Sequence, residues 1–323
     1  MKQKTISLLI ITILITTTIL FLVYSKEVME TVTFSISIWK DNLLPSLFPF
    51  FIVSELLINY GLVELLSEAL KNFMNKVFHL PGEAAFVIIG SLISGFPSSS
   101  KYINELLITK KISVKNAEYL LKFNHFSNPL FVIGTIGTLL LNNKKLGLLI
   151  LLVHIISNFL IAIIFRPKNC DYSSNSSFIN GLDKMNKKRI EHNSSFVSVL
   201  TESIFKTFKT LILLLGVITF FLIISTLIKQ VIPTNDLTYS IISGLLEMTG
   251  GIKNISSLNF PIQFKASIIT FFISFGGFSI HMQVMSILSN YKIKYIPYFI
   301  SRLLHGIIAS TIVYIILTVT QFL

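Results

Sequence analysis

Two apolar stretches of this chain are interrupted by helix-breaking residues, and this constrains the fold more than any other feature. Residues 91–101 read SLISGFPSSSK and residues 271–281 read FFISFGGFSIH. Each begins like a membrane-crossing helix and then breaks on glycine, proline or serine. In hydrocarbon, unpaired backbone N–H and C=O groups cost several kcal/mol each, so such a break survives only inside protein or beside a water-filled cavity. The sequence therefore predicts a membrane transporter built around two broken helices.

Composition supports a membrane protein of the all-α polytopic class. Of 323 residues, 52% are hydrophobic and only 13% are charged, which is too little polar surface for a soluble protein of this size. The net charge of +12 comes from basic residues in loops beside apolar runs. That placement indicates loops facing anionic lipid and not nucleic acid. The single cysteine, Cys170, excludes an internal disulfide, and with no Cys/His cluster we expect neither a metal nor another cofactor.

The order of features predicts four segments. Residues 1–30 form an N-terminal signal-anchor helix, residues 31–165 a first membrane repeat, residues 166–200 a basic cytoplasmic linker and residues 201–323 a second repeat. The first repeat contains a helix over 62–78 with one apolar and one polar face, which suits the membrane surface. Two features indicate that the segment 201–323 repeats the segment 31–165. Each contains a broken helix, and a later span in each contains a histidine, His154 or His305. Whether the repeats are inverted is left open.

Several apolar runs are shorter than the roughly 20 residues that a span needs. They cover residues 84–97, 129–141 and 237–248. Short, interrupted segments in matching positions point to a transporter binding site, because half-helix ends present backbone groups to the substrate. We expect a re-entrant hairpin after Asn128, with Gly134 and Gly137 on its packing face, and an interhelical hydrogen bond for His154 and Asn158.

Five motifs resemble, in order, those of the YlbJ/SpoVV-type sporulation integral membrane proteins, which carry nucleoside-recognition (Gate) domains. They are GFPSSSK, NPLFVIG, GLLEMTGGI, FISFGGFSIHMQV and SRLLHG. Phe96 and Ser99 stand where that family usually has tyrosine and glycine, and Asn128 stands where glycine is common. The resemblance implies transport of dipicolinic acid across the outer forespore membrane of an endospore former. The residues alone indicate an integral membrane protein, and the resemblance implies that its membrane is the outer forespore membrane or the cell membrane of a spore-forming bacterium.

A small planar dianion would suit these residues. Backbone N–H groups after Gly95 and Gly276 and hydroxyls of the neighbouring serines would bind its carboxylates, together with a cation from Lys101 or Arg302. An interfacial lysine and a headgroup anchor are the alternatives for these two cations. Glu247 would accept a proton or cap a half helix. The substrate-binding candidates are Ser94, Gly95, Phe96, Pro97, Ser98, Lys101, Asn128, Pro129, Glu247, Ser274, Gly276, Gly277, His281, Gln283 and Arg302.

Other functions remain as alternatives. A transporter of nucleosides or another aromatic acid is the main one, and a membrane scaffold without transport is the second. An enzyme is not expected, since HExxH, GxSxG and a Gly-rich phosphate loop are absent and only Ser94 or Ser274 with His281 could suggest a hydrolase. The partners expected are a small anionic substrate and the lipid bilayer, with the coupling ion (H⁺ or Na⁺) and a homo-oligomer left open.

Overall fold

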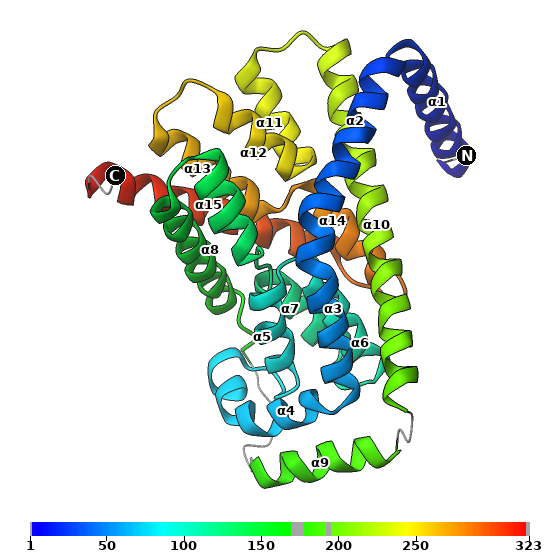
Figure 1. The fold of residues 1–323 in the computed structure, drawn as a ribbon, viewed down its shortest axis with the longest axis vertical. Helices are drawn as coiled ribbons and strands as arrows, with labels where there is room; N and C mark the ends of the chain where they lie inside the picture. The colour runs from blue at the N-terminus through cyan, green and yellow to red at the C-terminus, as the bar shows by residue number, and fades with distance from the viewer. Residues whose placement is uncertain (1, 169–177, 192–194, 321–323) are drawn as a thin grey trace.

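A computed structural model describes residues 2–168, 178–191 and 195–320, and every element in these ranges is helical. Cys170 and parts of the predicted linker 166–200 lie outside the described residues. The molecule is elongated, with long helices along its main axis and shorter ones packed across them (Figure 1). This architecture confirms the prediction of an all-α polytopic protein.

One side of the molecule is a column of helices. The column consists of α2 (Ser25–Ile38), a π-helical turn η1 (Trp39–Leu43) and α3 (Leu44–Asn59), and it packs along α10 (Phe196–Val231). Polar side chains join the two partners. Trp39 Nε1 donates to the Leu211 carbonyl at 2.8 Å, and hydroxyls pair at 2.8 Å between Ser35 and Thr219 and between Thr31 and Thr226.

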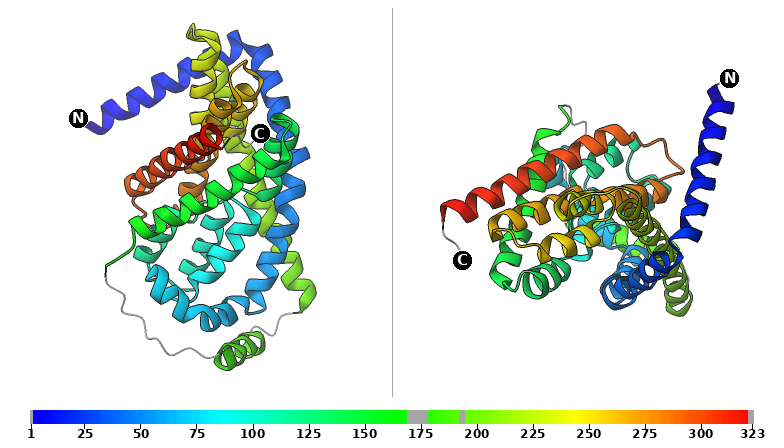
Figure 2. Two further views of the ribbon diagram at one scale, coloured as in Figure 1. Left: turned by 90° about the vertical axis from the view of Figure 1, so that its left-hand side faces the viewer. Right: turned by 90° about the horizontal axis from the view of Figure 1, so that it is seen from above.

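The first helix, α1 (Lys2–Val23), projects away from this column (Figures 1 and 2). None of the residues in its 20-residue apolar segment is buried within the protein. An apolar helix of this length, without protein neighbours along it, fits the predicted signal-anchor segment.

At the other end of the column the chain turns sharply. Helix α3 meets α4 (Leu62–Phe73) and the π-turn η2 (Met74–Phe78) at an angle of 80°. Helix α9 (Phe178–Glu191) packs against α4 and closes this end of the molecule (Figure 1). The polar face predicted for 62–78 meets protein as well as solvent, because Glu64 pairs with Lys111 and Glu68 pairs with Lys184 of α9.

The first broken helix consists of α5 (Ala84–Ser94) and α6 (Ser98–Ile108), and α7 (Val114–Phe123) follows it. The predicted N-cap of α7 is confirmed, since Ser113 Oγ accepts from the Asn116 N–H at 3.2 Å. A loop over 124–128 then leads into the π-helix η3 (Phe131–Leu140).

Helix η3 turns back onto α8 (Lys144–Ile164), and the two pack as a hairpin. Their backbones touch at two glycines, because a Cβ built on Gly137 would lie 2.7 Å from Gly147 Cα. Gly137 thus packs as predicted. The prediction for Gly134 is wrong, because a Cβ there would meet nothing within 4 Å.

The second half contains two further helix pairs and a final long helix. The pairs are α11 (Asp236–Leu246) with α12 (Met248–Ser257), and α13 (Ile262–Phe275) with α14 (Gly277–Ile287). The last helix, α15 (Tyr295–Val319), packs along α13 and crosses beside α8 (Figure 2). In the second half the broken helix packs along the long helix α15, whereas in the first half α5 and α6 pack against α3, α4 and α7. The internal repeat stays a prediction.

Five described helices are long and apolar enough to cross a membrane, and six if the bent pair of α3 and α4 counts as one span. In this count α13 and α14 form one 26-residue span with a break inside it. Much of this span is buried by protein and not exposed, as a helix interruption at that depth requires.

We predict opposite effects for the two glycines of η3. Gly137→Ala should lower the free energy of unfolding by about 1–3 kcal/mol, because its methyl group would overlap Gly147. Gly134→Ala should leave that free energy unchanged or raise it by up to about 1 kcal/mol through helix propensity. Thermal unfolding of both purified variants in one detergent checks this. Equal melting temperatures would contradict the packing of η3 on α8.

Candidate functional site

Four interruptions of the helices meet at one place, which we call the junction. It consists of residues 95–97, 124–128, 246–248 and 276–277. A Cβ built on Gly95 would lie 2.5 Å from the Asn128 backbone nitrogen, and one on Gly276 would lie 2.7 Å from His125 Nε2. Gly277 in turn approaches the Met248 nitrogen, at 3.2 Å from its Cβ position. The two broken helices are therefore brought together through the loop 124–128.

Glycine is required at both breaks. Gly95 and Gly276 have φ angles of +79° and +91°, in the region that L side chains rarely adopt. Their crowded Cβ positions add a second, steric reason. The Phe96 N–H donates to the Phe126 carbonyl at 2.6 Å, which satisfies one of the groups that the first break leaves free.

Asn128 joins two helix ends with one side chain. Its Oδ1 accepts from the Leu130 N–H at 2.8 Å and from the Phe131 N–H at 3.4 Å, which caps the start of η3. Its Nδ2 donates to the Ser94 carbonyl at 3.3 Å, at the last residue of α5. The amide thus satisfies donors at one helix end and an acceptor at another.

Glu247 lies at the break between α11 and α12 and is buried. Its Oε2 accepts from the Gly250 N–H at 3.0 Å and from the Thr249 hydroxyl. The sequence left two roles open for Glu247, proton acceptor and helix cap. These contacts are those of a cap, and the capped helix is α12, which Glu247 directly precedes.

Arg302 is wholly buried, with 0% of its surface exposed. Its guanidinium donates to Asn158 Oδ1 at 3.3 Å, to His305 Nδ1 at 3.1 Å and to the Lys122 carbonyl. No carboxylate of the described residues forms an ion pair with it. Such burial excludes the headgroup-anchor alternative and leaves a cation in the core without a counter-charge.

Hydrogen bonds connect Arg302 to the junction through α8. Asn158 Nδ2 donates to the His125 carbonyl at 3.0 Å, so this amide contacts both the cation and the loop. His154 Nε2 accepts from the Ser127 N–H at 3.1 Å, which leaves the proton on Nδ1 to be donated to Ser274 Oγ at 2.9 Å. The interhelical hydrogen bonds predicted for His154 and Asn158 are confirmed.

Several buried polar atoms around the junction have no hydrogen-bond partner among the described residues. They are Asn124 Oδ1, His125 Nε2, Ser127 Oγ, Ser279 Oγ, Tyr298 Oη and Arg302 Nε. Buried polar atoms are nearly always hydrogen-bonded, so a group of exceptions marks a place where water or a ligand belongs. Tyr298 and Arg302 are four residues apart on α15 and share one helix face.

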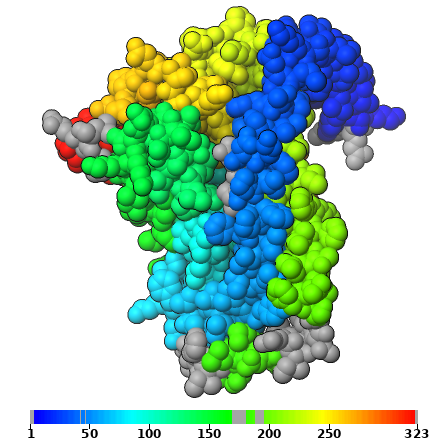
Figure 3. Space-filling model, in the orientation of Figure 1, coloured from blue at the N-terminus to red at the C-terminus, as the bar shows by residue number. Residues whose placement is uncertain are grey.

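A pocket of about 290 Å³ reaches the junction from the side of the column. Its inner wall is formed by Phe96, Ser127 and Asn128 from the first half and by Met248 and Thr249 from the second. Its outer walls come from residues 38–47 and 130–135, where η3 lies beside the column of α2, η1 and α3 (Figure 3). This volume is at the small end for ligand pockets, which are typically about 300–1,000 Å³.

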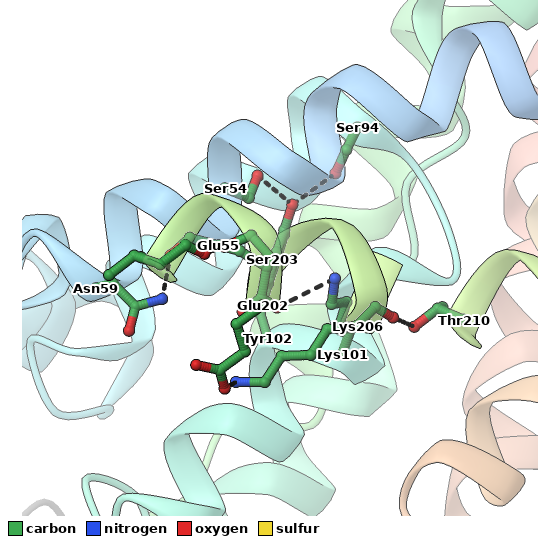
Figure 4. Close-up of polar contacts among 11 residues, drawn as sticks. Ser54, Glu55, Asn59, Ser94, Lys101, Tyr102, Glu202, Ser203, Lys206 and Thr210 are labelled. Carbon is green, nitrogen blue, oxygen red and sulfur yellow. Dashed lines mark hydrogen bonds and ion pairs between the residues drawn. The ribbon is translucent and has the colours of Figure 1, made fainter. Parts of the chain in front are cut away.

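Lys101 belongs to a separate cluster one turn beyond the first break (Figure 4). Its Nζ lies 3.1 Å from Glu55 Oε1, with only 11% and 3% of the two side chains exposed. It also lies over the Phe51 ring, 4.7 Å from the centroid. Lys101 is therefore a buried cation paired with Glu55 and not a lysine whose ammonium extends freely to the headgroups.

Tyr102 connects this cluster to the junction. Its hydroxyl donates to Ser54 Oγ at 2.7 Å and lies 3.3 Å from Ser94 Oγ (Figure 4). Ser94 Oγ in turn pairs with Ser98 Oγ at 2.6 Å, and Ser98 Oγ donates to the Gly95 carbonyl. The serines of the first break thus hold each other and the break.

The structure gathers most of the predicted site residues and separates three. The following residues lie at the junction or are hydrogen-bonded to its network: Ser94, Gly95, Phe96, Pro97, Ser98, Asn128, Pro129, Glu247, Ser274, Gly276, Gly277 and Arg302. Lys101 is held by Glu55. His281 bonds to the Phe275 carbonyl at 3.0 Å and to Tyr295 Oη at 3.1 Å, and Gln283 is buried on α14. Among the described residues, no group of three or more His, Cys, Asp or Glu is placed to hold a metal ion.

The chain was compared with known proteins. No protein-family model matches it, and no solved structure does. It is 30% identical to the sporulation integral membrane protein YlbJ of Bacillus subtilis (strain 168), over an alignment of 305 residues that covers 86% of this chain and 74% of the relative. The chain belongs to the YlbJ family. With five or six apolar spans, this YlbJ-family member is a multi-pass integral membrane protein.

The sequence analysis missed three residues of the junction. They are Asn124, His125 and Ser127, and Asn124 Nδ2 donates to Ser91 Oγ at 3.1 Å. The signal that would have found them is the polar run NHFSN, which directly precedes Pro129 between two apolar helices. Four polar residues among five in a membrane protein need partners or a function.

We predict that Asn128→Ala lowers the free energy of unfolding by about 1–2 kcal/mol, because it removes the cap of η3. Asn143 is a matched control, since its Oδ1 caps α8 by accepting from the Leu146 N–H at 3.0 Å. Asn143→Ala should cost a similar amount. Denaturation in detergent measures both. An Asn128→Ala protein as stable as the wild type would contradict the capping role.

We also predict that Glu55→Gln lowers the free energy of unfolding by about 3 kcal/mol, because it leaves the buried Lys101 charge unpaired. Adding Lys101→Met should recover at least about half of this loss. The exposed pair Glu202 and Lys206 serves as the control, and Glu202→Gln should cost less than about 1 kcal/mol. If the double variant is less stable than Glu55→Gln alone, the two charges are not coupled in the way the geometry indicates.

Proposed function

We propose that this protein transports a small organic anion, and that the anion is dipicolinic acid carried across the outer forespore membrane during sporulation. The observation that carries the proposal is the buried guanidinium of Arg302, which has no carboxylate partner among the described residues. A charge without a counter-charge is costly inside a membrane protein. A substrate carboxylate would supply the missing charge and a bidentate partner for the guanidinium.

The atoms around the junction match the remaining groups of a planar dianion. The unpartnered hydroxyls of Ser127, Ser279 and Tyr298 are donors that a second carboxylate or a ring nitrogen could accept from. Lys101 is already paired with Glu55, so Arg302 is the better candidate of the two cations proposed from sequence. A nucleoside carries no carboxylate to pair with Arg302, which favours the organic acid.

The broken helices provide the moving parts. Alternating access in transporters proceeds by rocking of helix bundles around a site that discontinuous helices form. Here the pocket stops at Phe96 and Ser127, one layer of side chains from the buried network. We assign this arrangement to a state in which the inner site is closed to the pocket, and the glycines at the two breaks to the hinges that open it.

The contacts of the serines favour transport over hydrolysis. A serine hydrolase needs its nucleophile hydrogen-bonded to the base. Ser274 Oγ does contact an imidazole, that of His154, but it accepts the proton on Nδ1, so this nitrogen cannot take a proton from the serine. His281, the base considered from sequence, bonds to Phe275 and Tyr295 and to neither serine. Ser94 pairs with Ser98 and Tyr102.

The test is uptake of labelled dipicolinate by vesicles that contain the purified protein. We expect uptake by the wild type, and at least about a tenfold loss in Gly276→Leu, because leucine would be strained at φ +91° and would overlap His125. Gly216→Leu is the matched control, since a Cβ there meets nothing within 4 Å. Normal uptake by Gly276→Leu would show that the junction is not the site.

Competing substrates separate the alternatives in the same assay. Uptake of uridine that dipicolinate does not inhibit would favour a nucleoside transporter. A folded wild-type protein that moves neither compound would favour the scaffold.

A further inference from the structure

We infer that the His125 ring is the stacking surface for the planar ring of the substrate, and that Phe96 occupies this surface in the present state. The inference rests on the proposed function, because it names how the substrate of that site is held and why an aromatic one is selected.

The two rings form a stacked pair at the boundary between the pocket and the buried network. Their centroids are 4.7 Å apart and their planes are inclined by 22°. His125 is 2% exposed, whereas Phe96 is half-buried and lines the pocket. Phe96 therefore contacts the pocket and the imidazole at once, and it covers His125 from the side by which a ligand would arrive.

The imidazole of His125 has no hydrogen bond that would explain a histidine at this position. Its Nε2 is buried without a partner. The contact that holds the loop here is made by the backbone, through the His125 carbonyl and Asn158 Nδ2 at 3.0 Å. A buried polar nitrogen that bonds to nothing destabilises the fold relative to an apolar ring of the same shape. The flat face of the ring, and not its nitrogen, is therefore the feature that the fold presents at this position.

The chain leaves room for the ring and allows its cover to move. The imidazole stands against Gly276, where a Cβ would lie 2.7 Å from Nε2, so the second break makes the space that the ring fills. Phe96 follows Gly95, which has a φ of +79° and, as a glycine, can adopt both positive and negative φ values. Rotation about Gly95 would carry the Phe96 ring from His125 into the pocket.

Replacement of one ring by another explains selectivity. A planar aromatic ligand restores on His125 the stacking that Phe96 gives up, whereas a flexible dicarboxylate leaves that face uncovered. The ring of the ligand would then lie on His125, and its carboxylate would point towards Arg302. Asn158 places these two residues close together, because it bonds to the His125 carbonyl and to the guanidinium. The chemical class selected is a planar aromatic compound, and one that also pairs with Arg302 carries a carboxylate on its ring.

Binding to the purified full-length protein in detergent tests the stacking, with dipicolinate, uridine and glutarate as probes. We expect His125→Ala to weaken dipicolinate binding about fivefold to tenfold and to change glutarate binding less than about twofold. His125→Phe keeps a flat ring and should bind dipicolinate within about threefold of the wild type. Equal dipicolinate affinity in the wild type and in His125→Ala would overturn the inference and leave the transport proposal standing.

Chemical modification tests the cover without any substrate. Diethyl pyrocarbonate labels accessible imidazoles, and mass spectrometry of peptides reports His125 separately from the other histidines. We expect Phe96→Ala to raise the labelling rate of His125 at least tenfold, and dipicolinate to slow it again. Phe78→Ala removes a ring stacked on Phe123 at 5.5 Å, away from the pocket, and should leave the His125 rate within about twofold.

The outcomes distinguish this inference from the proposed function. If uridine binds in place of dipicolinate and its binding depends on His125, the stacking surface stands and the dipicolinate assignment fails. If His125 stays unreactive in a folded Phe96→Ala protein, Phe96 is not its cover and the inference is wrong.

Discussion

The close approach of the loop 124–128 to both broken helices is the constraint on which the rest of the structure depends. At one end of the loop the Asn128 backbone fills the place of a side chain on Gly95, and at the other the His125 ring fills that place on Gly276. At the first break the loop also accepts a freed peptide group, since the Phe96 N–H donates to the Phe126 carbonyl and would otherwise meet lipid or apolar side chains. The breaks and the loop therefore stabilise each other, and a substitution in either one disturbs both.

The same approach organises the polar interior. Asn158 and His154, one turn apart on α8, both bond to the loop, and Ser274 of α13 accepts a hydrogen bond from the other nitrogen of His154. A connected network of this kind holds its members in one geometry, and a partly satisfied one signals a role beyond folding. The unpartnered atoms come from the loop, through Asn124, His125 and Ser127, from α14, through Ser279, and from α15, through Tyr298 and Arg302.

Much of the fold could be predicted from sequence, because helix breaks, caps and amphipathic faces depend on residues that are close together in the chain. The breaks at Gly95 and Gly276, the cap at Ser113 and the helix over 62–78 all follow from residue type and spacing. The site could be predicted only in part. Arg302 looks like an interfacial cation in sequence, and only the packing of α15 against α8 buries it. Lys101 pairs with Glu55, and His125 stacks on Phe96, through contacts between residues that are distant in sequence. The periodicity of the sequence does not predict such pairs.

The length of α10 determines how the protein can sit in a bilayer. With 36 residues it extends about 54 Å, against about 30 Å of hydrocarbon. Unless the helix tilts steeply, nearly half of it stands in water or among headgroups, and its charged first turns, with Glu202 and Lys206, are the part suited to that position. The Glu55–Lys101 pair lies beside those turns (Figure 4), so it would sit near the membrane boundary, where water relieves part of the cost of burying two charges. The helices α4 and α9 would then form a cap outside the lipid on that side, and the junction would be the deeper of the two charged centres.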